Sequence, residues 1–335
     1  MSVKIRFLKK NEIYKFQKLV EKHFPKKNHI FVKNTKVINF YYNFSNLKKI
    51  KILGLFYHKK LVAAQGLITM DNWDKNIKKH WHLAFTVKSK DYKKDCLILF
   101  LNYVFNLKPK FLGTVGTNMS TAGMVLNKLS KIKNLDHYYI VNPIIKNKIS
   151  KNLIKNKIKS RNTQNIKMLI NKKIHKLPKT IFAPKKTKKY FVNKYLNNPF
   201  YDYFLMNFYE NKKLLFFFVF REIFIKSINA KVIRIVDFYG NFPNNKDISQ
   251  NIIVYLIKKK IEYLDFLVGG LDNKILKKIG FNKKEKKMNI PNHFEPLNKK
   301  SHFLNYGIFL NKNIKKTLVF KGDGDQDRPS ILKKL

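Results

Sequence analysis

The chain has 335 residues, of which 44% are hydrophobic and 14% aromatic, enough to build two cores of ordinary size. Its formal net charge is +51, but only five of its 71 basic residues are arginine, and the lysines are dispersed along the chain. Proteins that read bases and phosphates rely on the arginine fork. The composition therefore argues against a dedicated nucleic-acid-binding role and favours an anionic small-molecule partner.

The single cysteine, Cys96, excludes an internal disulfide, and the apolar run 96–107 around it predicts a buried structural thiol. No apolar run approaches the length that crosses a bilayer, and the first ten residues lack the core of a signal peptide. We therefore expect a soluble cytoplasmic protein with no membrane span.

Alternating strands and helices are predicted in the first half of the chain. The apolar spacing of residues 12–23 predicts an amphipathic helix, and residues 37–44 form a second helix with an aromatic face. The short turn 58–60 joins two strands as a hairpin. The strands are expected at 3–8, 50–57, 61–70, 81–87, 111–117 and 137–141, the last closing the first domain, and further helices at 95–106 and 119–131.

The second half repeats this order after a stretch of different composition. Residues 144–184 are rich in Lys, Asn and Ile and predict a charged connector with some ordered pieces, because residues 166–170 are apolar enough to dock. Helices are then expected at 189–196, 248–261 and 271–281, and strands at 201–209, 214–225, 232–239 and 263–268.

One unit occurs twice, as an apolar strand, a glycine-bearing turn and a short helix. The first copy is the strand and turn at 111–118 with the helix at 119–131, and the second is 263–270 with 271–281. The offset between them is nearly constant, at about half the chain. The repeat therefore predicts two similar domains.

The first copy resembles the GNAT N-acyltransferase superfamily. There a splayed strand precedes a helix of the form Asn-x-x-x-Ala-x-x-x-Tyr-x-Lys-x-Gly-Phe. Asn118, Ala122 and Lys128 match the Asn, Ala and Lys of this pattern, whereas Leu126 stands at the tyrosine position.

The second copy keeps a different part of the same pattern. Lys278, Gly280 and Phe281 match its end, Leu276 replaces the tyrosine, and the Asn-x-x-x-Ala portion is absent. The two copies together thus resemble a tandem GNAT protein of the kind found with surface-polysaccharide enzymes.

The resemblance implies an α+β fold, a mixed sheet with helices on both faces, in two tandem GNAT-like domains. The expected boundaries are an N-terminal domain at 1–143, the connector at 144–184, a C-terminal domain at 185–320 and a Gly/Asp-rich tail at 321–335.

The resemblance also implies acetyl-CoA or another acyl-CoA as co-substrate, with no metal, and the first half is the better candidate for its site. In the family a glycine-rich turn offers backbone N–H groups to the CoA pyrophosphate. Here the turn 89–95 has no glycine, so lysine charge would hold the phosphates instead, with a solvated charged turn as the competing interpretation. The expected cofactor-binding residues are Phe85, Val87, Ser89, Lys90, Lys93, Lys94 and Asn118.

In the family a tyrosine often protonates the departing CoA thiolate, and leucine stands at its position in both copies. Acyl transfer can proceed without this tyrosine, because a CoA thiol leaves more readily than an alcohol. A base for the attacking amine is the greater need, and an imidazole suits proton removal from an ammonium. His82 and His137 are the candidates, each against the alternative of a strand histidine with a backbone partner.

Two further positions are candidates for catalysis or substrate binding in the second half. Asp237 lies among aromatic residues on a central strand and must find a partner or face a cleft, so it is a candidate to orient the amine, joined by Glu222. A structural pair between Arg234 and Glu222 is the competing interpretation.

The tail carries three acidic residues in a chain that has only 20. Asp323, Asp325 and Asp327 resemble the start of a calcium loop, but Arg328 occupies the position where such a loop needs glycine, so calcium is not expected. Either the tail is flexible, or these carboxylates fold back to a cleft and bind an amino or hydroxyl group of the substrate.

The sequence therefore predicts an acyltransferase that moves an acyl group from acyl-CoA to an amine, with an amino sugar or sugar nucleotide as acceptor. Two alternatives remain. One is a Fem-like transferase that uses aminoacyl-tRNA, the only role in which nucleic acid would be a partner. The other is a degenerate, non-catalytic GNAT pair that acts as a binding scaffold.

Overall fold

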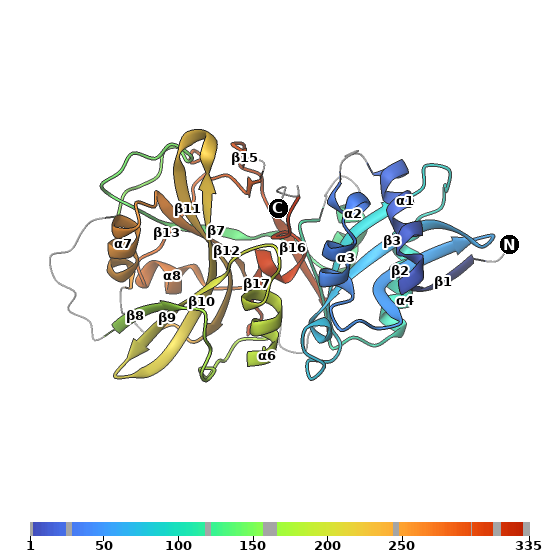
Figure 1. The fold of residues 1–335 in the computed structure, drawn as a ribbon, viewed down its shortest axis with the longest axis horizontal. Helices are drawn as coiled ribbons and strands as arrows, with labels where there is room; N and C mark the ends of the chain where they lie inside the picture. The colour runs from blue at the N-terminus through green and yellow to red at the C-terminus, as the bar shows by residue number, and fades with distance from the viewer. Residues whose placement is uncertain are drawn as a thin grey trace. The chain divides into compact units, whose positions relative to one another are not determined.

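The computed structural model describes residues 3–24, 29–117, 122–156, 166–243, 248–295, 297–310 and 316–330 (Figure 1). The chain divides into two compact units. Unit 1 comprises Met1–Lys133, Leu304–Ile314 and Asp323–Leu335, and unit 2 comprises Asn134–Phe303 and Lys315–Gly322. Each unit holds a large mixed sheet with helices, which confirms the predicted α+β class.

Unit 1 is built on a seven-stranded sheet with the order β1-β2-β3-β4-β5-β16-β6. Helices α1 to α3 precede the first hairpin, and α4 and α5 flank β5. The strands are β1 (Val3–Lys9), β2 (Lys49–Tyr57), β3 (Lys60–Thr69), β4 (His80–Lys88), β5 (Phe111–Val115), β6 (Lys133–Asn134) and β16 (Asn305–Leu310). The helices are α1 (Ile13–His23), α2 (Ile30–Lys33), α3 (Thr35–Tyr42), α4 (Cys96–Asn106) and α5 (Ala122–Leu129).

Local chemistry explains several of these elements. Helix α1 buries Phe16, Leu19 and Val20, whose spacing of three and four residues places them on one face. His58 and Lys59 both have positive φ, as the tight turn between β2 and β3 requires. The elements predicted for residues 3–106 are confirmed within a few residues at each end.

The core of unit 1 beside α4 joins residues from every central strand. Phe100, Leu101 and Val104 of α4 pack with Leu53 of β2 and Leu112 of β5. Cys96 belongs to the same cluster and is buried, and burial raises the pKa of its thiol, as expected for a structural cysteine.

Unit 2 is built on an eight-stranded sheet with the order β13-β7-β12-β11-β10-β9-β8, and β17 also pairs with β12. The strands are β7 (Asp136–Val141), β8 (Ile166–Asn171), β9 (Phe204–Glu210), β10 (Lys213–Ile225), β11 (Ala230–Gly240), β12 (Tyr263–Gly269), β13 (Asn282–Lys283), β14 (His293–Phe294), β15 (Leu297–Asn298) and β17 (Val319–Phe320). The helices are α6 (Lys188–Phe191), which continues into the turn η3 (Val192–Leu196), α7 (Ser249–Lys258) and α8 (Asn273–Lys278).

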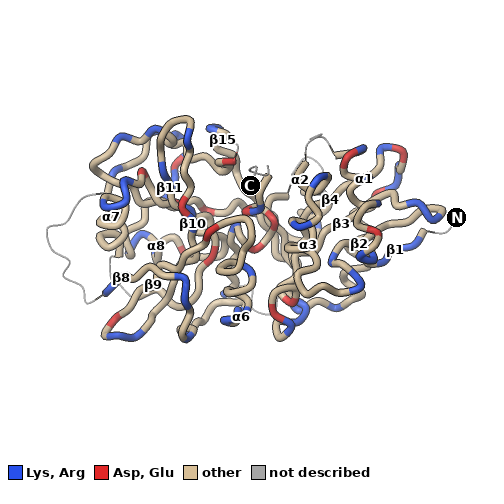
Figure 2. The backbone as a smooth tube through the Cα atoms, viewed as in Figure 1, with Lys and Arg blue, Asp and Glu red and all other residues tan. Residues whose placement is uncertain are grey.

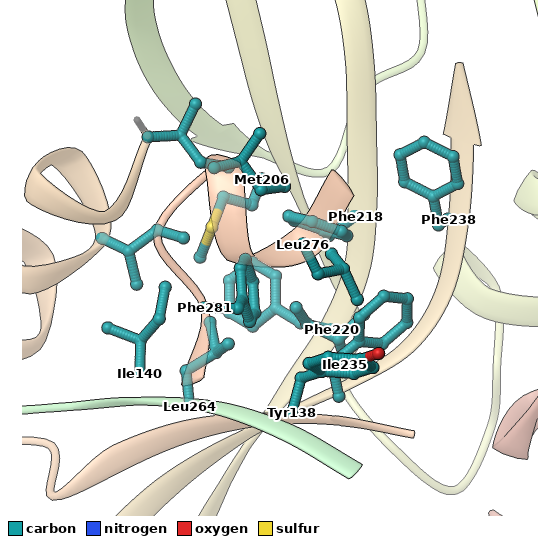
Figure 3. Close-up of a cluster of buried hydrophobic side chains, with 14 of the residues drawn as sticks. Tyr138, Ile140, Met206, Phe218, Phe220, Ile235, Phe238, Leu264, Leu276 and Phe281 are labelled. Atoms are coloured by element: carbon teal, nitrogen blue, oxygen red, sulfur yellow. The ribbon is translucent and has the colours of Figure 1, made fainter. Parts of the chain in front are cut away.

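The main core of unit 2 is rich in aromatic side chains (Figure 3). Phe218 and Phe220 of β10 pack against Leu276 of α8 and against Phe281, and all four are at most 2% exposed. Burial of each large apolar side chain contributes about 1.5–3 kcal/mol. This cluster therefore fixes the central strands of unit 2.

Each unit includes one strand from the other half of the sequence. Residues 137–141 were predicted to close the first domain, but β7 pairs antiparallel with β12 of unit 2 along its whole length. Conversely, β16, from the end of the chain, pairs antiparallel with β5 of unit 1. The prediction for 137–141 is therefore wrong, because a strand pairs with whichever edge its hydrogen bonds and apolar face complete, regardless of sequence distance.

The connector and the tail are also parts of the folded units. Within the predicted connector, β8 pairs antiparallel with β9 at the edge of the unit 2 sheet. In the predicted tail, Lys321 and Gly322 belong to unit 2, and residues from Asp323 onward belong to unit 1. The boundaries proposed at residues 143, 184 and 320 therefore do not coincide with the observed division.

Basic side chains are spread over both units rather than gathered on one element (Figure 2). Most of the lysines lie in loops and at strand ends. This distribution agrees with their dispersal along the sequence. In the part of the chain that the structure describes, no helix combines the length and apolarity needed to cross a bilayer.

The pairing of β7 and β16 predicts that residues 1–143 do not fold stably alone. Such a fragment lacks β16, so the edge of β5 is unpaired, and it carries β7 without its partner β12. We expect a broad thermal transition and binding of a hydrophobic dye. As control, residues 1–133 joined through a flexible linker to 304–310 restore β16 and should unfold cooperatively. A fragment 1–143 with a sharp transition would contradict the need for these pairings.

Candidate functional site

Strand β4 separates from β5 part-way along its length. The two strands run parallel and pair from His80 with Phe111 to Leu83 with Thr114. Beyond Leu83, β4 continues to Lys88 and stays paired with β3 on its other side. No strand of the described residues pairs with positions 84–88 on the side that faced β5, and this stretch is named the free edge of β4.

A β-bulge lies at the start of the free edge. The register between β3 and β4 shifts between Gln65 and Leu67, so that Gly66 faces two residues, Ala84 and Phe85. A bulge inserts one extra residue, bends the strand and redirects side chains, and bulges are common next to functional sites. The bulge therefore marks the place where β4 leaves β5.

The bulge redirects Phe85 away from the core that Leu83 joins. In a regular strand these two residues would share a face, but Leu83 packs in the core beside α4. The ring of Phe85 instead lies 5.2 Å from Phe31 of α2 and 6.0 Å from Phe16 of α1, between ring centroids. The free edge thus meets an aromatic cluster contributed by the first helices.

Tyr42, the last residue of α3, lies over the same bulge. A Cβ at position 66 would come within 2.7 Å of the Tyr42 hydroxyl, so the glycine makes room for this ring. Tyr42 is 0% exposed, and its hydroxyl has no hydrogen-bond partner among the residues that the structure describes. Burial raises the pKa of this hydroxyl well above its usual value, so the group stays protonated.

The C-terminal segment packs against the end of β5 in unit 1. Gly116 has φ of +79°, and a Cβ there would meet the side-chain amide of Gln326 at 2.2 Å. A Cβ at Gly324 would lie 3.2 Å from Cβ of Val115. Glycine at position 116 therefore permits both the left-handed backbone and the close approach of this segment.

Arg328 holds the C-terminal segment to the first helices of unit 1. Its Nε donates to Asp325 Oδ2 at 3.0 Å, and its Nη2 donates to His29 Nε2 at 2.9 Å. Its guanidinium also stacks 4.6 Å from the ring centroid of Phe31. Asp323, Asp325 and Asp327 are all at most 5% exposed, so this segment is packed into unit 1.

The predicted phosphate-binding residues occupy the turn between β4 and α4. Lys90, Lys93 and Lys94 are exposed there, whereas Ser89 is buried and its hydroxyl donates to Asp91 Oδ2 at 3.2 Å. Phe85 and Val87 lie on the free edge of β4, and Asn118 lies outside the described residues. The structure therefore brings six of the seven expected cofactor residues to one end of β4.

One residue that the sequence analysis did not use occupies the start of α4. Asp95 accepts hydrogen bonds from the backbone N–H groups of Leu97, at 2.8 Å, and Ile98, at 3.5 Å. These are the donors that a bound phosphate would use at a helix N-terminus. A phosphate at this turn must therefore bind the lysines beside Asp95 rather than the helix end itself.

The three predicted catalytic residues fall into different units. His82 belongs to unit 1, where it pairs with Gly113 of β5 just before the strands separate, is 1% exposed and lies 5.0 Å from the ring of Phe111. His137 and Asp237 belong to unit 2. The structure does not gather the three into one described cluster.

In unit 2, β11 takes the place that β4 has in unit 1. It pairs in parallel with β12 as far as Ile235 with Phe266, and its register with β10 then shifts around Val236. The bulge and the strand separation therefore occur in both units, at the same point of the repeated order.

In unit 2, a later segment of the chain lies where β11 and β12 separate. Strand β17 pairs antiparallel with β12 beyond Phe266, through Val268 with Phe320. A Cβ at Gly322 would lie 2.6 Å from the carbonyl oxygen of Val236 at the bulge. The ring of Phe320 stacks on Phe266 at 5.9 Å, so this stretch fills the side of β11 that is free on β4.

Asp237 lies in a buried ion pair beside this bulge. It accepts hydrogen bonds from Lys186 Nζ at 2.6 and 2.8 Å and from the Tyr195 hydroxyl at 2.9 Å. Asp237 is 0% exposed and Lys186 is 4% exposed. Tyr195 lies in the last turn of the helix that precedes the first hairpin of unit 2, as Tyr42 of α3 does in unit 1.

His137 belongs to a second buried network in unit 2. Its Nε2 lies 3.0 Å from Asp265 Oδ2. Asp265 also accepts two hydrogen bonds from Arg234, one from Nε at 3.0 Å and one from Nη2 at 2.6 Å. Burial lowers the pKa of His137, and the Arg234 guanidinium lowers the pKa of Asp265 despite its burial. Asp265 is thus ionised and accepts a hydrogen bond from the N–H of neutral His137.

The expected pair between Arg234 and Glu222 is wrong. Arg234 pairs with Asp265, its directly opposite residue on the parallel neighbour β12. Glu222 is exposed and accepts a hydrogen bond from the Tyr255 hydroxyl at 2.6 Å, so it does not join Asp237. A single acidic residue within the apolar strand 263–268 was the sequence signal for this partner.

No family model matches this sequence, and no curated protein matches it. Among solved structures, a GCN5-related N-acetyltransferase from Anabaena variabilis ATCC 29413 is similar, with a TM-score of 0.50 at 8% identity over 91% of this chain and 72% of that one. A conserved protein of unknown function from Enterococcus faecalis V583 gives a TM-score of 0.48 at 10% identity, over the same shares of the two chains.

The chain therefore has a GNAT-type fold. The similarity extends over most of the chain and so includes elements of both units. The GNAT-type fold agrees with the separation of β4 from β5, since a splayed strand is part of the pattern that the sequence resembles.

The buried state of His137 predicts how stability depends on pH. Its folded-state pKa lies below the usual value near 6.5, so the unfolded chain binds more protons, and the free energy of unfolding falls as pH drops below about 6.5. We expect His137→Gln to lose this contribution. Urea unfolding of both proteins from pH 8 to pH 5 should show the wild type losing more stability, and parallel profiles would contradict the burial of a neutral imidazole.

Proposed function

We propose that this protein transfers an acyl group from acyl-CoA to an amine, and that unit 1 holds the acyl donor. The observation that carries the proposal is the bulged free edge of β4, where backbone groups of a sheet strand face a position that no described strand fills. A thioester chain with amide groups, such as the pantetheine of CoA, has the donors and acceptors to bind along such an edge.

The proposed acyl-CoA site runs from the bulge to the turn before α4. The backbone of Phe85 and Val87 would align the acyl chain, and Asn118 belongs to the proposed site through the resemblance alone. Lys90, Lys93 and Lys94 would neutralise the diphosphate as mobile point charges. The Asp95 carboxylate at the helix start weakens this phosphate site relative to one with free helix N–H groups.

Unit 2 is proposed to bind no acyl-CoA. Its equivalent strand edge is covered by residues 317–322, of which Leu318, Val319 and Phe320 are at most 2% exposed. Displacing them would expose this apolar surface to water. Of the two alternatives in the sequence, a degenerate scaffold therefore describes unit 2 only.

The acceptor is proposed to be an amino sugar or a sugar nucleotide, used by a cytoplasmic enzyme of surface-glycan synthesis. Asp323, Asp325 and Asp327 are the proposed substrate-binding carboxylates, and their place in unit 1, the unit of the free edge, favours them over Glu222 of unit 2. His82 is the proposed base, because it alone of the three candidates lies in unit 1.

Titration calorimetry with acetyl-CoA tests the assignment of the donor site. We expect one equivalent to bind and the melting temperature to rise, since saturation at about 100 times the Kd stabilises a protein by roughly 2.7 kcal/mol. Binding of two equivalents of acetyl-CoA would contradict the proposal that unit 2 binds no acyl-CoA. Absence of both heat and thermal shift with acetyl-CoA and longer acyl-CoA esters would contradict the proposed function.

Substitutions in the turn before α4 test the phosphate site. The triple variant Lys90→Gln, Lys93→Gln, Lys94→Gln should weaken CoA binding about tenfold or more, because charge-assisted contacts to phosphate are lost. Asp95→Asn should tighten it, because asparagine still caps the helix without the negative charge. The same three substitutions at the exposed Lys258, Lys259 and Lys260 change net charge equally. Equal effects of the two triple variants would show that only overall charge matters.

A further inference from the structure

The hydroxyl of Tyr42 is buried at the bulge of β4 and is satisfied by no described residue. The ring packs over Gly66 of β3, which opposes Ala84 and Phe85 at the bulge, so the hydroxyl lies one strand away from the free edge of β4. A donor bound along the free edge of β4 with its acyl group at the bulge would bring that group close to this hydroxyl.

An unpaired buried hydroxyl is costly, because it loses its hydrogen bonds to water without gaining others. Native proteins leave few such groups, and those that persist call for a physical reason. Phenylalanine would fill the same space at position 42 at no such cost. At the bulge of β4, this hydroxyl is available to donate a hydrogen bond to a ligand that brings an acceptor.

In unit 2, the tyrosine beside the bulge has a hydrogen-bond partner within the chain. Tyr195, from the helix before the first hairpin of unit 2, donates to Asp237 beside the bulge at Val236. Unit 1 has the aromatic residue Phe85 next to its bulge, which accepts no such bond. The described residues therefore satisfy the hydroxyl of Tyr195 beside the bulge of unit 2 and offer no partner to the hydroxyl of Tyr42 at the bulge of unit 1.

The charged groups near Tyr42 belong to the C-terminal segment. Asp325 and Arg328 act electrostatically on the hydroxyl, but the described contacts of Arg328 are to Asp325, His29, Phe31 and the carbonyl oxygen of Pro329. Neither takes the hydroxyl as a hydrogen-bond partner. Tyr42 therefore remains a neutral donor beside an already paired ion pair.

We propose that Tyr42 is a substrate-contacting residue of unit 1, whose hydroxyl donates a hydrogen bond to the carbonyl oxygen of the acyl thioester. The assignment rests on the proposed function. When the amine nitrogen attacks the carbonyl carbon, this oxygen gains negative charge, which the hydrogen bond stabilises. The C–S bond then breaks, the amine gives up a proton, and the amide and the CoA thiol are released.

Two ligands that differ only at the thioester test the assignment. Acetyl-CoA carries the carbonyl that Tyr42 would contact, and CoA lacks it. We expect Tyr42→Phe to weaken acetyl-CoA binding about tenfold, the effect of one lost hydrogen bond in a buried site, and to leave CoA binding unchanged. The variant should unfold at the same temperature as the wild type or higher, because the unpaired hydroxyl is gone.

Tyr263→Phe is the matched control. Tyr263 lies on β12 of unit 2, is also 0% exposed, and its hydroxyl likewise has no partner among the described residues. This variant should also keep or raise the unfolding temperature, while both CoA ligands bind as in the wild type.

The outcomes separate this assignment from the proposed function. If the wild type binds both ligands and Tyr42→Phe leaves their affinity ratio unchanged, Tyr42 does not contact the thioester, although the acyl-CoA site stands. If Tyr42→Phe weakens both ligands equally, its role is structural and the assignment fails. If the wild type binds neither ligand, the proposed function falls and the assignment falls with it.

Discussion

The separation of β4 from β5 is the constraint on which the rest of unit 1 depends. Parallel pairing ends at Leu83 and Thr114, and the bulge opposite Gly66 then turns the strand. The extra residue sends Phe85 toward the first helices, and the lack of a side chain at Gly66 admits Tyr42. A bent strand with one unpaired edge, an aromatic floor and a buried hydroxyl thus follow from a single irregularity in the sheet.

The second unit carries the same irregularity with the opposite outcome. Its bulge at Val236 is covered by Gly322, and β17 pairs with the strand that turned away. Asp237 there holds Lys186 and Tyr195, so polar groups near the bulge are paired within the chain. The two units share a bulged strand that separates from its parallel neighbour, and residues 317–322 cover this place in unit 2.

Much of the fold was predictable because it depends on local patterns. Apolar residues at helical spacing located α1, and the turn at His58 and Lys59 located the first hairpin. The partner of each strand was not predictable. The apolar run of β7 suits either sheet, and only the full set of edges decides that it completes unit 2. The same holds for Arg234, for which the sequence suggested Glu222 and which pairs with Asp265 instead.

For the site, the sequence by itself determined the repeated order of elements, the lysine-rich turn before α4 and the unusual acidic segment at the end of the chain. These signals lie in composition and residue spacing, which can be read from the sequence without knowing which residues are neighbours in space. Only the tertiary structure decided that the acidic segment folds into unit 1 and that Tyr42 meets Gly66. Both depend on contacts between residues far apart in the chain, which are set by packing and backbone hydrogen bonding and leave no periodic trace in the sequence.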